Sequence, residues 1–146
     1  PDDKKFQESF AEKTFITTNN RNKVVVKYIL ARLEGEASGK ESDPESTDQT
    51  LGHILPENPE EGWEAFDDTQ VDPCKYALGN FTLLDGAVNR EIGNGPYESK
   101  RSTYEQSAYT ITENLASKFS KWDPDTVKRR QKHMAETAVL LWRFPE

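Results

Sequence analysis

Apolar residues recur at helical spacing in the first third of the chain. Phe6 and Phe10 lie four residues apart within residues 3–13, which predicts a short amphipathic helix. A second helix is predicted over residues 24–33, after a cap at Asn19. Its apolar side chains fall on one face: Val25, Val26, Ile29, Leu30 and Leu33.

The last third of the chain is also predicted to be helical. Helices are expected over residues 97–106, 110–119 and 124–142, and the third of them opens with an Asp-Pro cap. Thr110 and Glu113 have the spacing of a capping box, in which the two side chains satisfy each other's free backbone amides.

The middle of the chain has a different pattern. Residues 35–47 contain no large apolar side chain, which is typical of a solvated loop, and residues 67–73 look like a second acidic connection. Short apolar runs at 50–57 and 78–84 predict two strands, and residues 85–91 begin a helix. The fold class predicted is therefore α+β and mostly helical, with one strand–strand–helix unit.

Composition excludes some classes of protein. The 146 residues suffice for one domain, and three Trp, five Tyr and seven Phe argue against disorder. No apolar run is long enough to span a membrane, and no signal-like start is visible. The single Cys74 cannot form an internal disulfide, so a cytoplasmic location is expected. A first residue of Pro1 rather than Met suggests a piece of a longer protein.

The net charge of −7 argues against a nucleic-acid partner, but its distribution weakens that argument. Residues 1–75 contain 9 basic and 17 acidic side chains, whereas residues 76–146 contain 10 and 9. Basic residues of the second half cluster at 100–101 and 128–132, so DNA contact remains open there.

One histidine and two asparagines are the candidates for chemistry. His53 lies on the first strand just before Pro56, which places an imidazole at a strand end. A histidine on an apolar strand is more often a core residue than a functional one. Asn80 and Asn89 follow, on the second strand and the next helix, and asparagine is common at such turns. The ordered combination is more informative than any member.

The fragments "HILP", "LGNFTLL" and "NREIGNGPYESKR" together resemble the C-terminal nuclease domain of GmrSD-type restriction proteins, over about residues 48–143. That family belongs to the His-Me finger (HNH) superfamily, so the resemblance implies a ββα-metal motif embedded in a helical domain. It also implies a metal-dependent endonuclease that cuts or nicks foreign or phage DNA, with modified DNA as the expected target. A separate N-terminal domain of the same protein would sense the DNA and bind nucleotide.

The resemblance also assigns roles to residues. His53 matches the general base that activates water, and its ordinary pKa near 6.5 suits that task. Asn80 matches the asparagine that orients the base and fixes the loop between the strands. Asn89 would ligate Mg²⁺ or Mn²⁺ through its amide oxygen, with His53 as the second residue of the metal site. Lys100 would hold the scissile phosphate.

Further DNA contacts are expected from arginines. Arg90 and Arg101 are weaker alternatives to the lysine as phosphate ligands. Arg129 and Arg130 lie in the basic run on the last helix, which either touches the DNA backbone or is simply a solvated face.

The expected organisation is a single nuclease domain over residues 1–146. Its parts are a helical lead-in (1–34), an acidic loop (35–47), the ββα-metal core (48–100) and C-terminal helices (101–146).

One position departs from the family pattern. Members commonly carry an acidic residue just before the histidine, as a second metal ligand, and here that position is Gly52. The nearest acids in sequence are Asp48, Glu57 and Asp85. Either one of these acids completes the metal site, or metal binding is weakened.

Three alternatives to an active DNA endonuclease stay open: an inactive DNA-binding module, a protein-interaction domain using the acidic residues 34–72, and an RNase of the same superfamily.

Overall fold

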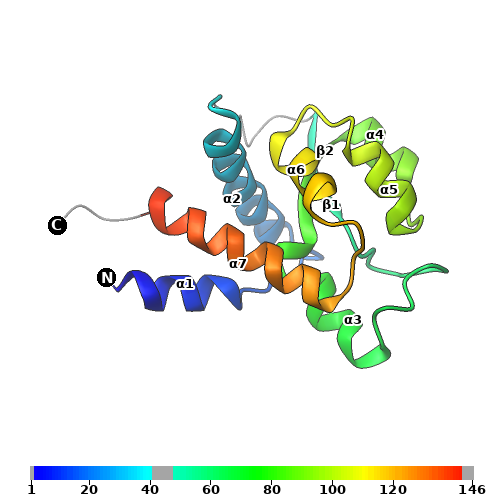
Figure 1. Ribbon diagram of the computed structural model, residues 1–146, viewed down its shortest axis with the longest axis horizontal. Helices are drawn as coiled ribbons and strands as arrows, with labels where there is room; N and C mark the ends of the chain where they lie inside the picture. The colour runs from blue at the N-terminus through cyan, green and yellow to red at the C-terminus, as the bar shows by residue number, and fades with distance from the viewer. Residues whose placement is uncertain (1, 41–47, 143–146) are drawn as a thin grey trace.

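The computed structural model describes residues 2–40 and 48–142. Its helices surround one two-stranded antiparallel sheet (Figure 1). In chain order the elements are α1 (Asp3–Ala11), α2 (Asn20–Ser38), β1 (Gln49–His53), α3 (Asp68–Lys75), the 3₁₀ turn η1 (Leu78–Asn80), β2 (Phe81–Asp85), α4 (Gly86–Ile92), α5 (Tyr97–Tyr104), α6 (Thr110–Lys118) and α7 (Pro124–Leu141).

The two strands pair antiparallel, from Gln49 opposite Asp85 to His53 opposite Phe81. The chain passes directly from β2 into α4, whose first turn is capped by the Asp85 side chain. Figure 1 shows α2 on one side of the two-stranded sheet and α4 with α5 on the other. The order strand, strand, helix predicted from the sequence is confirmed, as is the mostly helical α+β class.

The long helix α7 packs along α1 and against η1. The close approach at η1 requires a glycine, because a Cβ on Gly79 would collide with the backbone oxygen of Val127. Gln131 of α7 joins η1 to the end of α1: its Oε1 accepts from Gly79 N at 2.8 Å, and its Nε2 donates to Phe10 O and Lys13 O. These hydrogen bonds thus connect α7 to η1 and to the C-terminal end of α1, which are far apart in sequence.

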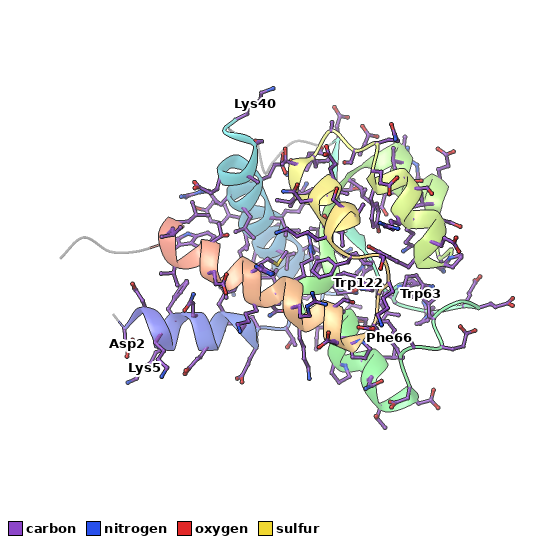
Figure 2. All side chains as sticks on the ribbon, viewed as in Figure 1. Asp2, Lys5, Lys40, Trp63, Phe66 and Trp122 are labelled. Atoms are coloured by element: carbon purple, nitrogen blue, oxygen red, sulfur yellow. The ribbon has the colours of Figure 1, made fainter. Side chains whose placement is uncertain are left out.

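Aromatic side chains fill the core where α3, α5 and the start of α7 meet (Figure 2). Trp63, Phe66 and Trp122 are all buried, and Trp122 stacks on Tyr97 at 5.6 Å. These large aromatic side chains are therefore structural anchors of the core.

Three local predictions were wrong. Residues 67–73 are not a connection, because Asp67 and Gln70 form a capping box that starts α3. The second strand begins only at Phe81, after the 3₁₀ turn. Thr110 does not cap α6, since the carboxylate of Glu34 in α2 accepts from Thr110 N and Ile111 N at 2.9 Å each.

The segment predicted as a solvated loop begins later than expected. Helix α2 continues to Ser38 and ends at Gly39, whose φ of 73° is a left-handed conformation suited to glycine. Residues 41–47 of the predicted loop lie outside the described residues. Within residues 2–40 and 48–142, no helix is long and apolar enough to cross a membrane.

Candidate functional site

A polar pocket of about 390 Å³ lies where β1 ends. His53 comes from the last residue of β1, Asn89 from α4 and Lys100 from α5. The structure thus brings three of the sequence-predicted site residues to one place. The full lining is Leu51, His53, Pro56, Glu57, Asn58, Asn89, Gly93, Asn94 and Lys100.

The imidazole of His53 is packed between aromatic rings, with Phe81 at 4.6 Å and Tyr76 at 6.2 Å between ring centroids. Its Nε2 lies 3.4 Å from the hydroxyl of Thr17, which is buried. Its Nδ1 lies 4.0 Å from the half-exposed carboxylate of Glu57. The Nε2 side therefore faces the interior and the Nδ1 side faces the pocket.

Burial lowers the pKa of His53 from 6.5 to about 4, because a charged imidazolium loses hydration there. The carboxylate of Glu57 raises this pKa, and the positive charge of Lys100 lowers it further. The imidazole is consequently neutral near pH 7, which is the form that accepts a proton or binds a metal ion.

Asn80 is fully buried beneath the loop that follows β1. Its Oδ1 accepts from Leu55 N at 2.8 Å and from the indole of Trp122 at 3.0 Å. Its Nδ2 donates to Leu55 O at 2.9 Å and Lys75 O at 3.1 Å. The two bonds to Leu55 fix the chain just after His53, and the bonds to Lys75 and Trp122 anchor the Asn80 side chain to the neighbouring segments.

Asn89 is only partly buried and is oriented differently. Its Nδ2 donates to Leu51 O at 2.8 Å and Thr50 Oγ1 at 3.2 Å. These bonds fix the amide so that Oδ1 lies on the other side, where the described residues offer it no hydrogen-bond donor. That oxygen is available as an acceptor or a metal ligand.

Lys100 is 2% exposed, and its amine donates to His53 O and Ile54 O at 2.9 Å each. The amine also lies 5.5 Å from the centroid of the Trp63 ring. Burial lowers the pKa of Lys100 to about 8. Two of its three N–H donors are thus committed to the main chain at His53, and it is not an open cationic surface.

Residues 1–137 match the family described as the C-terminal domain of GmrSD restriction endonucleases. The chain belongs to this family. A search among curated proteins gave no match.

Gly52, the position where the resemblance implied an acidic residue, is enclosed in this structure. A Cβ there would lie 2.6 Å from Leu84 Cδ1 and 3.7 Å from Asn89 Oδ1. The position therefore does face Asn89, but Leu84 occupies the space that a side chain would need.

Of the three acids nearest in sequence, only Glu57 lines the pocket. It is held by Tyr76 OH, 3.4 Å from Oε2, while Lys75 Nζ donates to its backbone oxygen at 3.0 Å. Asp85 is engaged as the cap of α4. Glu57 was one of the three acids named from the sequence, whereas Asn58 and Asn94 were not singled out, because the fold of two loops brings them to the pocket.

The pocket's donors fit one kind of metal ion better than another. Within the described ranges, no group of three His, Cys, Asp or Glu side chains is placed to hold an ion. Asn89 Oδ1, the Glu57 carboxylate and the His53 imidazole could supply only a few ligands. Such a set suits Mg²⁺ or Mn²⁺ that keeps several waters, and does not suit a fully enclosed zinc ion.

The candidate DNA-contacting arginines divide by exposure. Arg90 is exposed on α4, and Arg129 is exposed on α7 with Asp125 at 3.7 Å. Arg101 is about one third exposed, and its Nε donates to Ala116 O at 2.9 Å.

Arg130 does not fit the expectation of a DNA contact. It is 5% exposed, and its guanidinium donates to Gly79 O, Phe81 O and Thr82 Oγ1. The helical spacing of the sequence contained the signal, because Arg130 falls three residues after Val127 and four before Met134, on the apolar face of α7.

Proposed function

We propose that this domain is a divalent-metal-dependent DNA endonuclease of the His-Me finger type. Membership of a restriction endonuclease family supports the class of reaction and DNA as the substrate. The observation that carries the proposal is the single pocket shared by His53, Asn89 and Lys100, located at the strand–strand–helix unit. The domain would act on foreign or phage DNA, as the effector of a protein whose other domain senses modification.

His53 is the general base in this proposal. In the tautomer that has its proton on Nε2, this N–H donates a hydrogen bond to Thr17 Oγ1, and Nδ1 keeps its lone pair on the pocket side. Water bound there gives its proton to Nδ1 as it attacks the phosphorus. The Glu57 carboxylate, 4.0 Å away, then favours the imidazolium that results.

Asn80 and Lys100 are positioning residues. Both hold main-chain atoms at or just after His53, so they keep the imidazole in place without touching substrate. Arg90, Arg101 and Arg129 lie at least partly exposed and would contact the DNA backbone.

Asn89, with Glu57 and His53 nearby, would hold Mg²⁺ or Mn²⁺. When bound, such an ion would stabilise negative charge on the phosphate and on the leaving oxygen.

The test is cleavage of supercoiled plasmid with Mg²⁺, Mn²⁺ or EDTA, using the wild type, Asn89→Ala and the exposed control Asn114→Ala. We expect metal-dependent cleavage that Asn89→Ala abolishes and Asn114→Ala leaves unchanged. Cleavage that persists in EDTA, or that survives Asn89→Ala, contradicts the assignment.

The packing of Leu84 against Gly52 favours a second candidate, a domain that binds DNA and cuts it poorly. The double variant Gly52→Glu with Leu84→Ala separates the two, because it restores an acid beside Asn89 and makes room for it. A rise in Mn²⁺ affinity by calorimetry, together with faster cleavage, supports the second candidate. Unchanged affinity means that the metal ligands lie elsewhere.

A further inference from the structure

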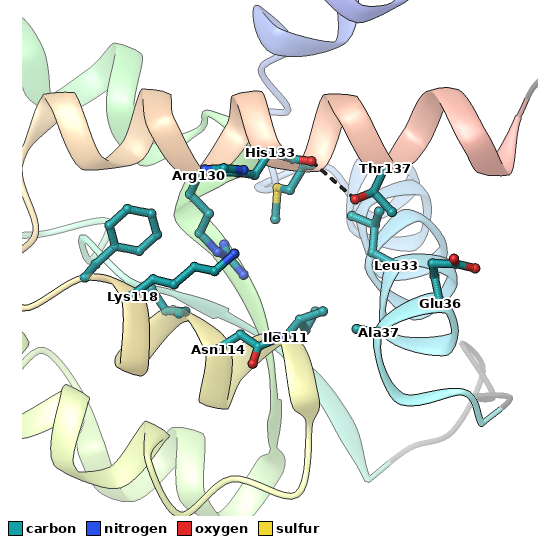
Figure 3. A pocket seen from close by; sticks show the side chains of 12 residues that line it. Leu33, Glu36, Ala37, Ile111, Asn114, Lys118, Arg130, His133 and Thr137 are labelled. Carbon is teal, nitrogen blue, oxygen red and sulfur yellow. Dashed lines mark hydrogen bonds between the residues drawn. The ribbon is translucent and has the colours of Figure 1, made fainter.

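A second, smaller pocket of about 190 Å³ lies between α2, α6 and α7 (Figure 3). Among the described residues, none that lines it also lines the His53 pocket. Its apolar wall includes Leu33 and Ile111, and its rim carries the exposed side chains of Lys118 and His133. Figure 3 shows Arg130 extending from α7 into this space, toward the same region as Lys118.

Arg130 has a charge that the fold does not neutralise. A guanidinium has five N–H donors, and the described residues accept from three of them: Gly79 O, Phe81 O and Thr82 Oγ1. All three acceptors are uncharged, and no ion pair to Arg130 occurs within residues 2–40 and 48–142. Burial lowers the pKa of Arg130 to about 10, so it remains charged at pH 7.

Buried charges in proteins are normally paired, because an unpaired one is costly to desolvate. Arg130 is 5% exposed, lines this pocket, and has two N–H donors for which the described residues provide no acceptor. A second cation, Lys118, lies at the rim. Asn114 and Thr137 add polar groups to the lining, which also includes the exposed carboxylate of Glu36 on α2, across the pocket from Arg130 and Lys118 (Figure 3). These features together match a bound anion.

The size and the wall of the pocket limit what the anion can be. A dry apolar cavity of about 150 Å³ takes a benzene molecule, so 190 Å³ accommodates a group of about that size. We propose that this pocket binds a small organic anion, with one carboxylate-like acid group against Arg130 and Lys118 and a ring-sized apolar body against Leu33 and Ile111.

The test uses benzoate as the probe, with neutral benzamide and inorganic phosphate as comparisons. Lys118→Gln removes the rim cation. Arg130 itself is not substituted, because it also holds the main chain at Gly79 and Phe81 and its loss would destabilise the fold. Lys132→Gln is the matched control, an exposed lysine of α7 that does not line this pocket. Binding is measured by NMR titration, which also locates the probe through the methyl signals of Ile111 and Met134.

We expect benzoate to bind with a Kd of about 1 mM, and benzamide and phosphate about tenfold more weakly. Lys118→Gln should weaken benzoate binding several-fold, and Lys132→Gln should not change it. Equal binding of benzamide would mean that the charge is not recognised, and equal binding of phosphate that the apolar wall is not. Either result overturns the proposal, as does an absence of saturable binding or equal effects of the two lysine variants.

Discussion

The floor and the mouth of the His53 pocket use similar polar residues in opposite ways. We call the buried pair Asn80 and Lys100 the floor: Lys100 lines the pocket, and Asn80 lies beneath the loop that follows β1. Their polar atoms are bonded to main-chain and indole groups. The mouth is formed by the His53 ring, Glu57 and Asn89 and is partly exposed. Two of its atoms, His53 Nδ1 and Asn89 Oδ1, have no hydrogen-bond partner among the described residues. The contrast separates residues that shape the site from residues that can do chemistry, and each should respond differently to substitution.

The largest effect on stability is expected at the floor, from Asn80→Ala. It leaves four partners of Asn80 without their hydrogen bonds, two of them on Leu55. We expect a loss of about 3–5 kcal/mol in the free energy of unfolding, measured by urea denaturation. Asn89→Ala, at the mouth, should cost about 1 kcal/mol. Similar costs for the two asparagines would remove the distinction between floor and mouth.

The next effect is a pH dependence that comes from the mouth. The pKa of His53 is about 4 in the folded protein and about 6.5 when unfolded, so the unfolded chain binds the proton more tightly. His53 therefore contributes stability that is fully present above pH 6.5 and is lost as the pH falls toward 4. The total is on the order of 3 kcal/mol.

This pH dependence is measured by denaturation at a series of pH values. His53→Gln should flatten the curve between pH 6.5 and 4, and the surface control His133→Gln should leave it as in the wild type. A curve that His53→Gln does not alter would show that the imidazole is not buried as described.

Lys100→Met separates positioning from phosphate binding. It removes the donor to His53 O and Ile54 O, so we expect a loss of about 2 kcal/mol in stability. Because two of the three donors face the main chain, the salt dependence of DNA binding should change little. A slope reduced by about one unit in a log–log salt titration would instead identify Lys100 as a phosphate contact.

The smallest change in stability is expected for Arg129→Gln, below about 0.5 kcal/mol, because Arg129 is exposed on α7. Its effect should appear in DNA binding, as a several-fold weaker affinity and a shallower salt dependence. Arg130→Gln, one residue further on, should show the reverse: a marked loss of stability. If both arginines affect only DNA binding, the buried position of Arg130 is wrong.

The sequence was sufficient where function depends on local order. The short apolar runs at 50–57 and 78–84, followed by residues 85–91, predicted a strand–strand–helix unit because these signals are local, although Asn80 lies in the turn before β2 and not on the strand. The five predicted helices were also found, with shifted ends.

The sequence was insufficient where partners are distant along the chain. Glu34 caps α6 from 76 residues away, so the nearer Thr110–Glu113 pattern was misleading. Residues 67–73 were predicted to be a connection because they are acidic, although most of them lie in α3, whose start depends on the local capping box of Asp67 and Gln70. Arg130 was grouped with its basic neighbours, yet the helical face assigns it to the core. Loop convergence likewise brought Glu57 to the pocket.

The central claim is that the chemistry belongs to the mouth of the pocket, and above all to His53. The most direct measurement is the rate of Mn²⁺-dependent plasmid cleavage by His53→Gln beside His133→Gln, with the folded fraction of each verified by circular dichroism. We predict a drop of at least about 100-fold for His53→Gln and no change for His133→Gln. A folded His53→Gln protein that cleaves at nearly the wild-type rate would contradict the account.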